Sequence, residues 1–131
     1  MGTEYAFGNA EAGTYYPAIV PAIPILGLIA QHGEEWAKLT AVEILTDWLF
    51  SFYPEPKQEK IIDSDSSEVD LQMVVDREIM KLRPTIEHLA FRSNLPDPKK
   101  VWLREILLGM DEMQEAESAT KRSESLSRNS L

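Results

Sequence analysis

PAIPIL at residues 21–26 lines up with PTIEHL at residues 84–89, and this pairing decides the fold. About twenty residues further on, EIL at residues 43–45 lines up with EIL at residues 105–107. In each copy a proline near the front of an apolar helix is followed by a turn and a second apolar helix. An internal repeat of helix pairs is typical of an α-solenoid, whose surfaces mostly bind other macromolecules. The repeat therefore predicts an all-α fold that acts by binding.

The composition fits one soluble domain and excludes several classes of function. The chain has 131 residues, of which 44% are hydrophobic, and its formal net charge is −9. This acidity argues against nucleic acid and anionic membranes as partners, because both attract basic surfaces. The chain has no cysteine, which excludes disulfides, a thiolate nucleophile and Cys-based zinc sites. We expect a cytoplasmic protein without a cofactor.

The apolar stretch at residues 15–30 raises the question of a membrane span or a secretory signal. It is shorter than the roughly 20 residues that a helical span needs, and it contains Pro17, Pro21 and Pro24. No Lys or Arg precedes Lys38, whereas a signal peptide has a positively charged start. We therefore expect this stretch to form a buried core helix.

Apolar periodicity, prolines and polar runs predict where the helices begin and end. The expected helices lie at about residues 16–31, 34–53, 67–92 and 98–116. The rest is an extended lead-in at 1–14, a polar link at 54–66 and a disordered tail at 117–131. The helical domain thus covers residues 15–116.

Individual residues refine these helix boundaries. Pro17 suits a first helical turn, whereas Pro21 removes one internal hydrogen bond and predicts a kink or a broken first turn. Gly33 is a good residue to end the first helix. A capping box at residues 67–70 starts the third helix, and Pro84 is expected to bend it.

The second helix is apolar on most of its circumference and carries one narrow polar stripe. The stripe residues are spaced by three or four and are Thr40, Glu43, Asp47 and Ser51. A helix this apolar needs neighbours on two sides. The stripe is a candidate row of partner contacts, and simple solvation is the alternative interpretation.

The three tryptophans are expected in the core, with their indole N–H groups near its boundary. Trp36 and Trp102 begin the second helices of the two units, and Trp48 lies late in the first of these helices. Any tryptophan that is exposed becomes a candidate interface anchor, because tryptophan is enriched at binding hot spots.

The acidic run DSDSS at residues 63–67 is a second candidate contact. It resembles the start of a calcium loop, but Glu68 and Val74 stand where such a loop needs Gly and a bidentate Glu. We interpret the run as a solvated link, with Asp63 and Asp65 as an alternative docking strip for a basic partner.

The sequence contains no motif that indicates an enzyme. It has no nucleophile elbow, phosphate-binding Gly loop or HExxH sequence. His32 and His88 are its two histidines, and neither has a converging set of ligands that predicts a metal site. We therefore expect no catalytic, cofactor or metal residues.

The second copy carries the fuller signature of a known repeat family. LRP at residues 82–84, Asp97-Pro98 and VWLR at residues 101–104 resemble HEAT-like repeats. GTYYPA at residues 13–18, followed by VPAIPIL at residues 20–26, is similar to a group of largely uncharacterised bacterial HEAT-like proteins. The resemblance implies two antiparallel helix pairs, which form a short α-solenoid or a compact four-helix array.

The resemblance covers roughly residues 8–116, with one departure in length. The copies are offset by 63 residues at their first matched segment and by 62 at their second, whereas HEAT units run about 40–47 residues. The link at 54–66 accounts for most of the excess. Two units are few for a solenoid, so the chain is a fragment, a compact variant or a subunit that stacks on another copy.

Together these features predict a non-enzymatic protein–protein interaction module. Two alternatives stay open: an immunity- or antitoxin-like protein that neutralises a basic partner, and a structural subunit that self-associates. An enzyme that uses His32 or His88 has no positive support. Because the first helix pair is the more apolar one, the missing neighbour is expected against residues 16–53.

Overall fold

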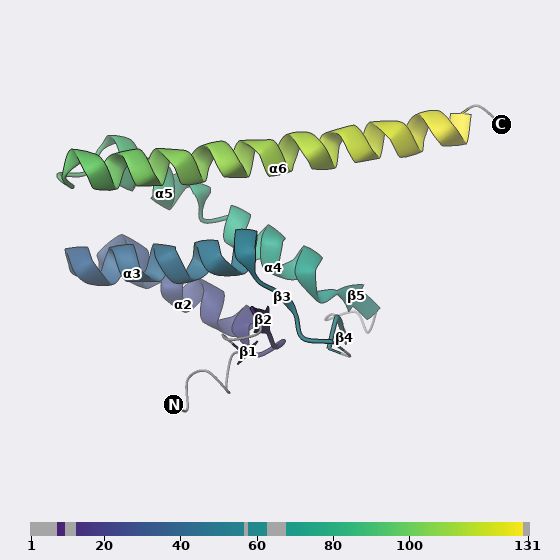
Figure 1. Cartoon of the computed structure of the whole chain (residues 1–131), viewed down its shortest axis with the longest axis horizontal. Coiled ribbons are helices and arrows are strands. Elements are labelled where there is room, and N and C mark those ends of the chain that lie inside the picture. Colours follow the sequence, from purple (N-terminus) through teal and green to yellow (C-terminus); the bar gives the residue numbers. More distant parts are fainter. Residues whose placement is uncertain (1–7, 10–12, 57, 63–67, 130–131) are drawn as a thin grey trace. The chain divides into compact units, whose positions relative to one another are not determined.

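Most of the described chain is helical, which confirms the all-α prediction (Figure 1). The computed structural model describes residues 8–9, 13–56, 58–62 and 68–129. Its α-helices are α2 (Ile19–His32), α3 (Glu35–Thr46), α4 (Leu71–Met80), α5 (Arg83–Phe91) and α6 (Asp97–Asn129). The solenoid arrangement stays a prediction. The chain divides into two compact units, residues 1–85 and 86–131, which are described separately.

α2 begins three residues later than predicted, because a turn precedes it. In this turn the backbone N–H of Ile19 donates to the carbonyl of Tyr16. Pro21 falls in the first helical turn, where a missing N–H leaves no intrahelical bond unmade. Pro24 is the proline inside the helix. In the described ranges, each helix is too short or too polar to cross a bilayer.

The chain turns back from α2 into α3 at Gly33, as predicted, but for a different reason. The φ angle of Gly33 is −71°, which any residue can adopt. A Cβ atom here would lie 2.7 Å from the carbonyl oxygen of Ile29 and 3.3 Å from the Cβ of Ala37. Glycine is therefore needed because a Cβ atom would clash with the last turn of α2 and crowd the first turn of α3.

The helix predicted at residues 34–53 is α3 followed by a π-helical turn, η1 (Asp47–Ser51). The N–H of Phe52 donates to the carbonyl of Asp47 at 2.8 Å, which is the five-residue spacing of a π-turn. The wider turn accommodates Trp48 and Leu49, which are both buried. The core of this first unit thus extends past the end of α3.

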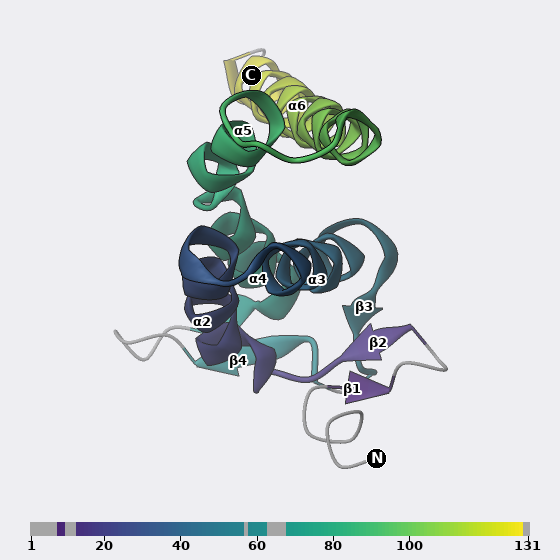
Figure 2. The same ribbon diagram turned by 90° about the vertical axis from the view of Figure 1, so that its left-hand side faces the viewer.

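Short strands form in the predicted lead-in and polar link, and they also replace the ends of two predicted helices, at Tyr53 and at residues 68–70 (Figure 2). β2 (Thr14–Tyr15) lies between β1 (Gly8–Asn9) and β3 (Tyr53–Pro54), antiparallel to β1 and parallel to β3. β4 (Lys60–Ile62) pairs with β5 (Glu68–Asp70) in antiparallel register. The polar link is therefore partly a hairpin, and the lead-in is held against the end of η1.

The predicted third helix is two helices, and Pro84 explains the break. α4 ends at Met80, Lys81 and Leu82 form a turn, and Pro84 is the second residue of α5, where its missing N–H is tolerated. The start of α4 also differs from the predicted capping box. Asp70 is itself the N-cap, and its carboxylate accepts from the N–H of Gln72 at 3.0 Å.

In the second unit, α5 and α6 each carry buried apolar residues. α5 contributes Ile86, Leu89 and Ala90, and α6 contributes Leu103, Ile106, Leu107 and Met110. The tail predicted to be disordered from residue 117 is instead helical to Asn129. Local i,i+4 bonds support this segment, including the ion pair between Lys121 and Glu117 at 3.2 Å.

Candidate functional site

The outer side of α2 exposes large apolar side chains. We call this surface the apolar band and define it as Pro21, Pro24, Ile25, Leu28 and Ile29, whose spacing puts them on one helical face. Ile25 is 60% exposed and Leu28 is 58% exposed. α2 contains no Asp, Glu, Lys or Arg, so no charged side chain interrupts the band.

The opposite side of α2 is the side that packs into the core, so the apolar band faces away from the core. α2 packs against α3 and α4 through Ile19, Ile23, Gly27 and Ala30. Gly27 permits a close approach, since a Cβ atom there would lie 2.7 Å from Cδ2 of Leu82. We predicted a core helix covered on most of its circumference; within the described residues only this side is covered.

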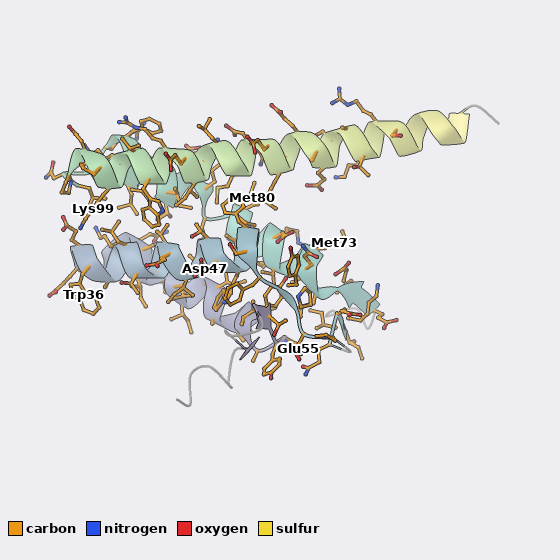
Figure 3. The ribbon with its side chains drawn as sticks, in the orientation of Figure 1. Trp36, Asp47, Glu55, Met73, Met80 and Lys99 are labelled. Atoms are coloured by element: carbon orange, nitrogen blue, oxygen red, sulfur yellow. The ribbon has the colours of Figure 1, made fainter. Side chains whose placement is uncertain are left out.

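Trp36 lies at the start of α3 and is 69% exposed, so its predicted place in the core is wrong (Figure 3). It lies nine positions before buried Leu45, which puts the two on opposite sides of the helix. Its indole N–H donates to the Glu34 carboxylate at 3.0 Å. Trp48 is buried as predicted, and Trp102 is half-buried.

The predicted polar stripe is exposed along α3 and η1, and Trp36 belongs to the same face. Thr40 lies one turn after Trp36 and its hydroxyl donates to the Trp36 carbonyl at 2.8 Å. Glu43, Asp47 and Ser51 are exposed on the following turns. Phe50, which the sequence analysis did not single out, is 42% exposed at the far end. We call these six residues the α3 row.

The α3 row is acidic in the middle and aromatic near both ends. Burial raises the pKa of Asp47, and the neighbouring charge of Glu43 raises it further. Within the part of the chain that the structure describes, neither carboxylate forms an ion pair with Lys or Arg. The row therefore presents two like charges, about one helical turn apart, without a cation between them.

The two copies of the repeated segment show the same order of burial. PAIPIL lies in α2 and PTIEHL lies in α5. Ile23 and Ile86, the third residue of each segment, are buried. The next two positions are exposed in both copies, and they hold Pro24 and Ile25 in the first but Glu87 and His88 in the second.

This comparison separates what the helix requires from what the surface adds. Glu87 and His88 show that α5 is compatible with polar side chains at these solvent-facing positions. The apolar side chains of Pro24 and Ile25 are therefore a property of the first copy rather than a requirement of the repeat. An apolar surface in excess of what the fold needs is typical of a contact site.

Tyr15 is a buried titratable residue with a strongly raised pKa. The side chain is fully buried, and its hydroxyl has no hydrogen-bond partner among the described residues. Burial raises its pKa above the ordinary value, and the charges of Asp76 and Asp70 raise it further. The phenol therefore stays protonated in the folded chain.

The remaining candidates lie apart from these surfaces. His32 and His88 are both exposed. The described residues contain no group of three or more His, Asp or Glu side chains placed to hold a metal ion. Asp63 and Asp65, the predicted docking strip, lie outside the described residues.

Comparison of this chain with protein-family models, curated proteins and solved structures finds no match. The apolar band and the α3 row are therefore interpreted from their own geometry and chemistry.

Proposed function

We propose that this protein is a non-enzymatic, HEAT-like protein–protein interaction module whose contact surface is the apolar band. The exposure of Ile25 and Leu28 carries this proposal. Burying a large aliphatic side chain contributes about 1.5–3 kcal/mol. Since each of these two is more than half exposed, a partner that covers them gains roughly 1 kcal/mol or more from each.

The placement of the repeated segments supports a HEAT-like pair. The first matched segments lie in α2 and α5, and the second matched segments lie in α3 and α6. Short loops join the members of each pair, at residues 33–34 and 92–96. Equivalent segments thus occupy the first and second helices of successive pairs, as in a helical repeat.

The test places a photo-crosslinking amino acid at Leu28 in the full chain, expressed in the source cells. A matched control places it at Arg77, an exposed position of α4 in the same unit. We expect a discrete protein adduct from position 28 that is absent from position 77. Equal labelling at both positions, or none at position 28, would contradict the proposal.

A surface variant makes the test independent of folding. Pro24→Glu with Ile25→His copies the residues that α5 carries at the equivalent exposed positions. We expect this variant to keep its helical circular dichroism and to lose the adduct at position 28. Retention of the adduct would show that the apolar band is not the contact surface.

Self-association is a second candidate, favoured by the absence of charge from α2. Two copies with a net charge of −9 repel each other, but two apolar bands can meet without placing like-charged side chains of α2 together. Sedimentation velocity across a concentration series distinguishes the candidates. A monomer at all concentrations excludes the self-associating subunit and leaves a different protein as the partner.

An immunity- or antitoxin-like role is the third form of this proposal. It needs a surface that attracts a basic partner, and the acidic centre of the α3 row supports it. A cytoplasmic location stays a prediction from the absence of cysteine.

A further inference from the structure

We propose that the α3 row docks a basic helix of a partner protein, with two cationic side chains against Glu43 and Asp47 and an apolar side chain against Trp36. This inference rests on the proposed function as an interaction module and names the chemistry of its partner. It concerns a surface distinct from the apolar band, since the α3 row lies on α3 and η1.

The spacing along the row defines the pattern that a partner must carry. A helix rises 1.5 Å per residue, so Glu43 and Asp47 lie about 6 Å apart along the axis, and Trp36 lies about 10 Å before Glu43. All three lie on one line of the helix surface. An antiparallel helix matches them with two cations four positions apart and an apolar residue seven positions beyond the second cation.

Charge favours this occupant over a second copy or a nucleic acid. Between Lys38 and Lys57 the sequence contains acids but no Lys or Arg. The Glu43 and Asp47 carboxylates repel each other, and no described cation relieves that repulsion. A second copy would bring two like rows together, and a polyanion would meet the same repulsion. A partner that places one cation at each carboxylate removes this repulsion.

The exposed aromatic side chains add an anchor to the charge. The Glu34 carboxylate holds the Trp36 indole through its N–H, which leaves the ring exposed for an aliphatic side chain. Phe50 provides a second exposed ring beyond Asp47. A helix fits better than an extended segment, because an extended segment would find no strand edge on α3 to pair its backbone.

The probe is an alanine-rich helical peptide with blocked ends that carries Arg, Arg and Leu at this spacing. A second peptide of the same composition places the two arginines on opposite faces. Binding to the full chain is followed by NMR titration in low salt. We expect the first peptide to shift the signals of the α3 row and to bind at least about tenfold more tightly than the second.

Charge-neutral variants then localise the site. Glu43→Gln with Asp47→Asn should weaken binding about tenfold, and Trp36→Ala should weaken it as well. The matched control, Glu112→Gln with Glu115→Gln, removes the same charge from two exposed residues of α6 and should leave binding unchanged. Equal weakening by the control pair, equal binding of both peptides, or no binding would overturn the proposal.

The peptide-binding experiment and the crosslinking experiment at position 28 can fail independently of each other. Pro24→Glu with Ile25→His should leave peptide binding unchanged, because it alters the apolar band alone. If the peptide does not bind while the adduct at position 28 persists, the module stands and the basic helix is excluded. If the peptide binds, but the chain that keeps Pro24 and Ile25 forms no adduct at position 28, the α3 row is the contact surface.

Discussion

Replacing Tyr15 with Phe tests the most unusual feature of the core. The hydroxyl of Tyr15 is fully buried and finds no hydrogen-bond partner among the described residues. An unsatisfied buried polar group costs about 1–3 kcal/mol. Tyr15→Phe removes the hydroxyl and keeps the ring, so we expect it to raise the free energy of unfolding at neutral pH by about 1 kcal/mol.

The same substitution has a second effect that depends on pH. Because the pKa of Tyr15 is raised above its ordinary value of 10.0, the folded state holds the phenol proton more tightly than the unfolded state. Wild-type stability is therefore complete below about pH 10 and falls as the pH rises further. With a limiting slope of 1.36 kcal/mol per pH unit, the wild type loses about 1.4 kcal/mol relative to Tyr15→Phe between pH 9 and pH 11.

Urea unfolding at pH 7, 9 and 11 measures both effects in the full chain. Fluorine-labelled Trp48 gives an NMR signal from the same unit as Tyr15, and this signal does not exchange at high pH. A less stable Tyr15→Phe variant at pH 7 would refute the claim that the hydroxyl lacks a partner. A stability difference that stays constant from pH 9 to 11 would show that the phenol is not held protonated by burial.

Three further predictions concern α3, the turn before it and α6. Asp47→Asn should stabilise the fold at pH 7 by less than about 0.5 kcal/mol, because burial and the charge of Glu43 raise the Asp47 pKa and solvent screens the effect. This gain in stability should vanish in urea unfolding at pH 3, which is below the ordinary aspartate pKa of 3.8. A gain that persists at pH 3 would contradict its electrostatic origin. Gly33→Ala should lower stability by about 1–3 kcal/mol, because its Cβ would lie 2.7 Å from a backbone oxygen, and an unchanged melting temperature would contradict this. Hydrogen exchange in α6 should be slow up to Met113 and fast over residues 114–129, because the side chains of residues 114–123 are all exposed. Equal protection along the whole of α6 would contradict this prediction and show that another contact supports the segment.

Helix positions were largely predictable, because the signals that set them are local. Apolar periodicity and proline placement located α2 and the segment formed by α3 and η1 to within a few residues, and they predicted a bend at Pro84 where the structure has a break. The predicted end of the last helix was less accurate. Polar composition after residue 116 indicated disorder, whereas the segment is helical to Asn129 and local i,i+4 pairs such as Lys121–Glu117 support it.

The candidate surface was predictable in part. Thr40, Glu43, Asp47 and Ser51 are exposed as their spacing predicts, although their role as contacts stays a prediction. Trp36 was predicted to lie in the core together with the other two tryptophans. Its helical phase, which matches Thr40 and opposes buried Leu45, was the signal in the sequence that could have placed it correctly.

The sequence by itself determined a mostly helical chain with a repeated first-helix segment and a polar stripe. Periodicity, prolines and charge are local signals, which depend on only a few neighbouring residues. Only the tertiary structure decided which apolar residues are buried and which are exposed. The pairing of Thr14 with Tyr53 joins segments far apart in the chain, and Tyr15, which pairs with Pro54 in the same ladder, is fully buried. The exposure of Ile25 likewise follows from where α3 and α4 pack against α2, since burial depends on neighbours that local sequence does not specify.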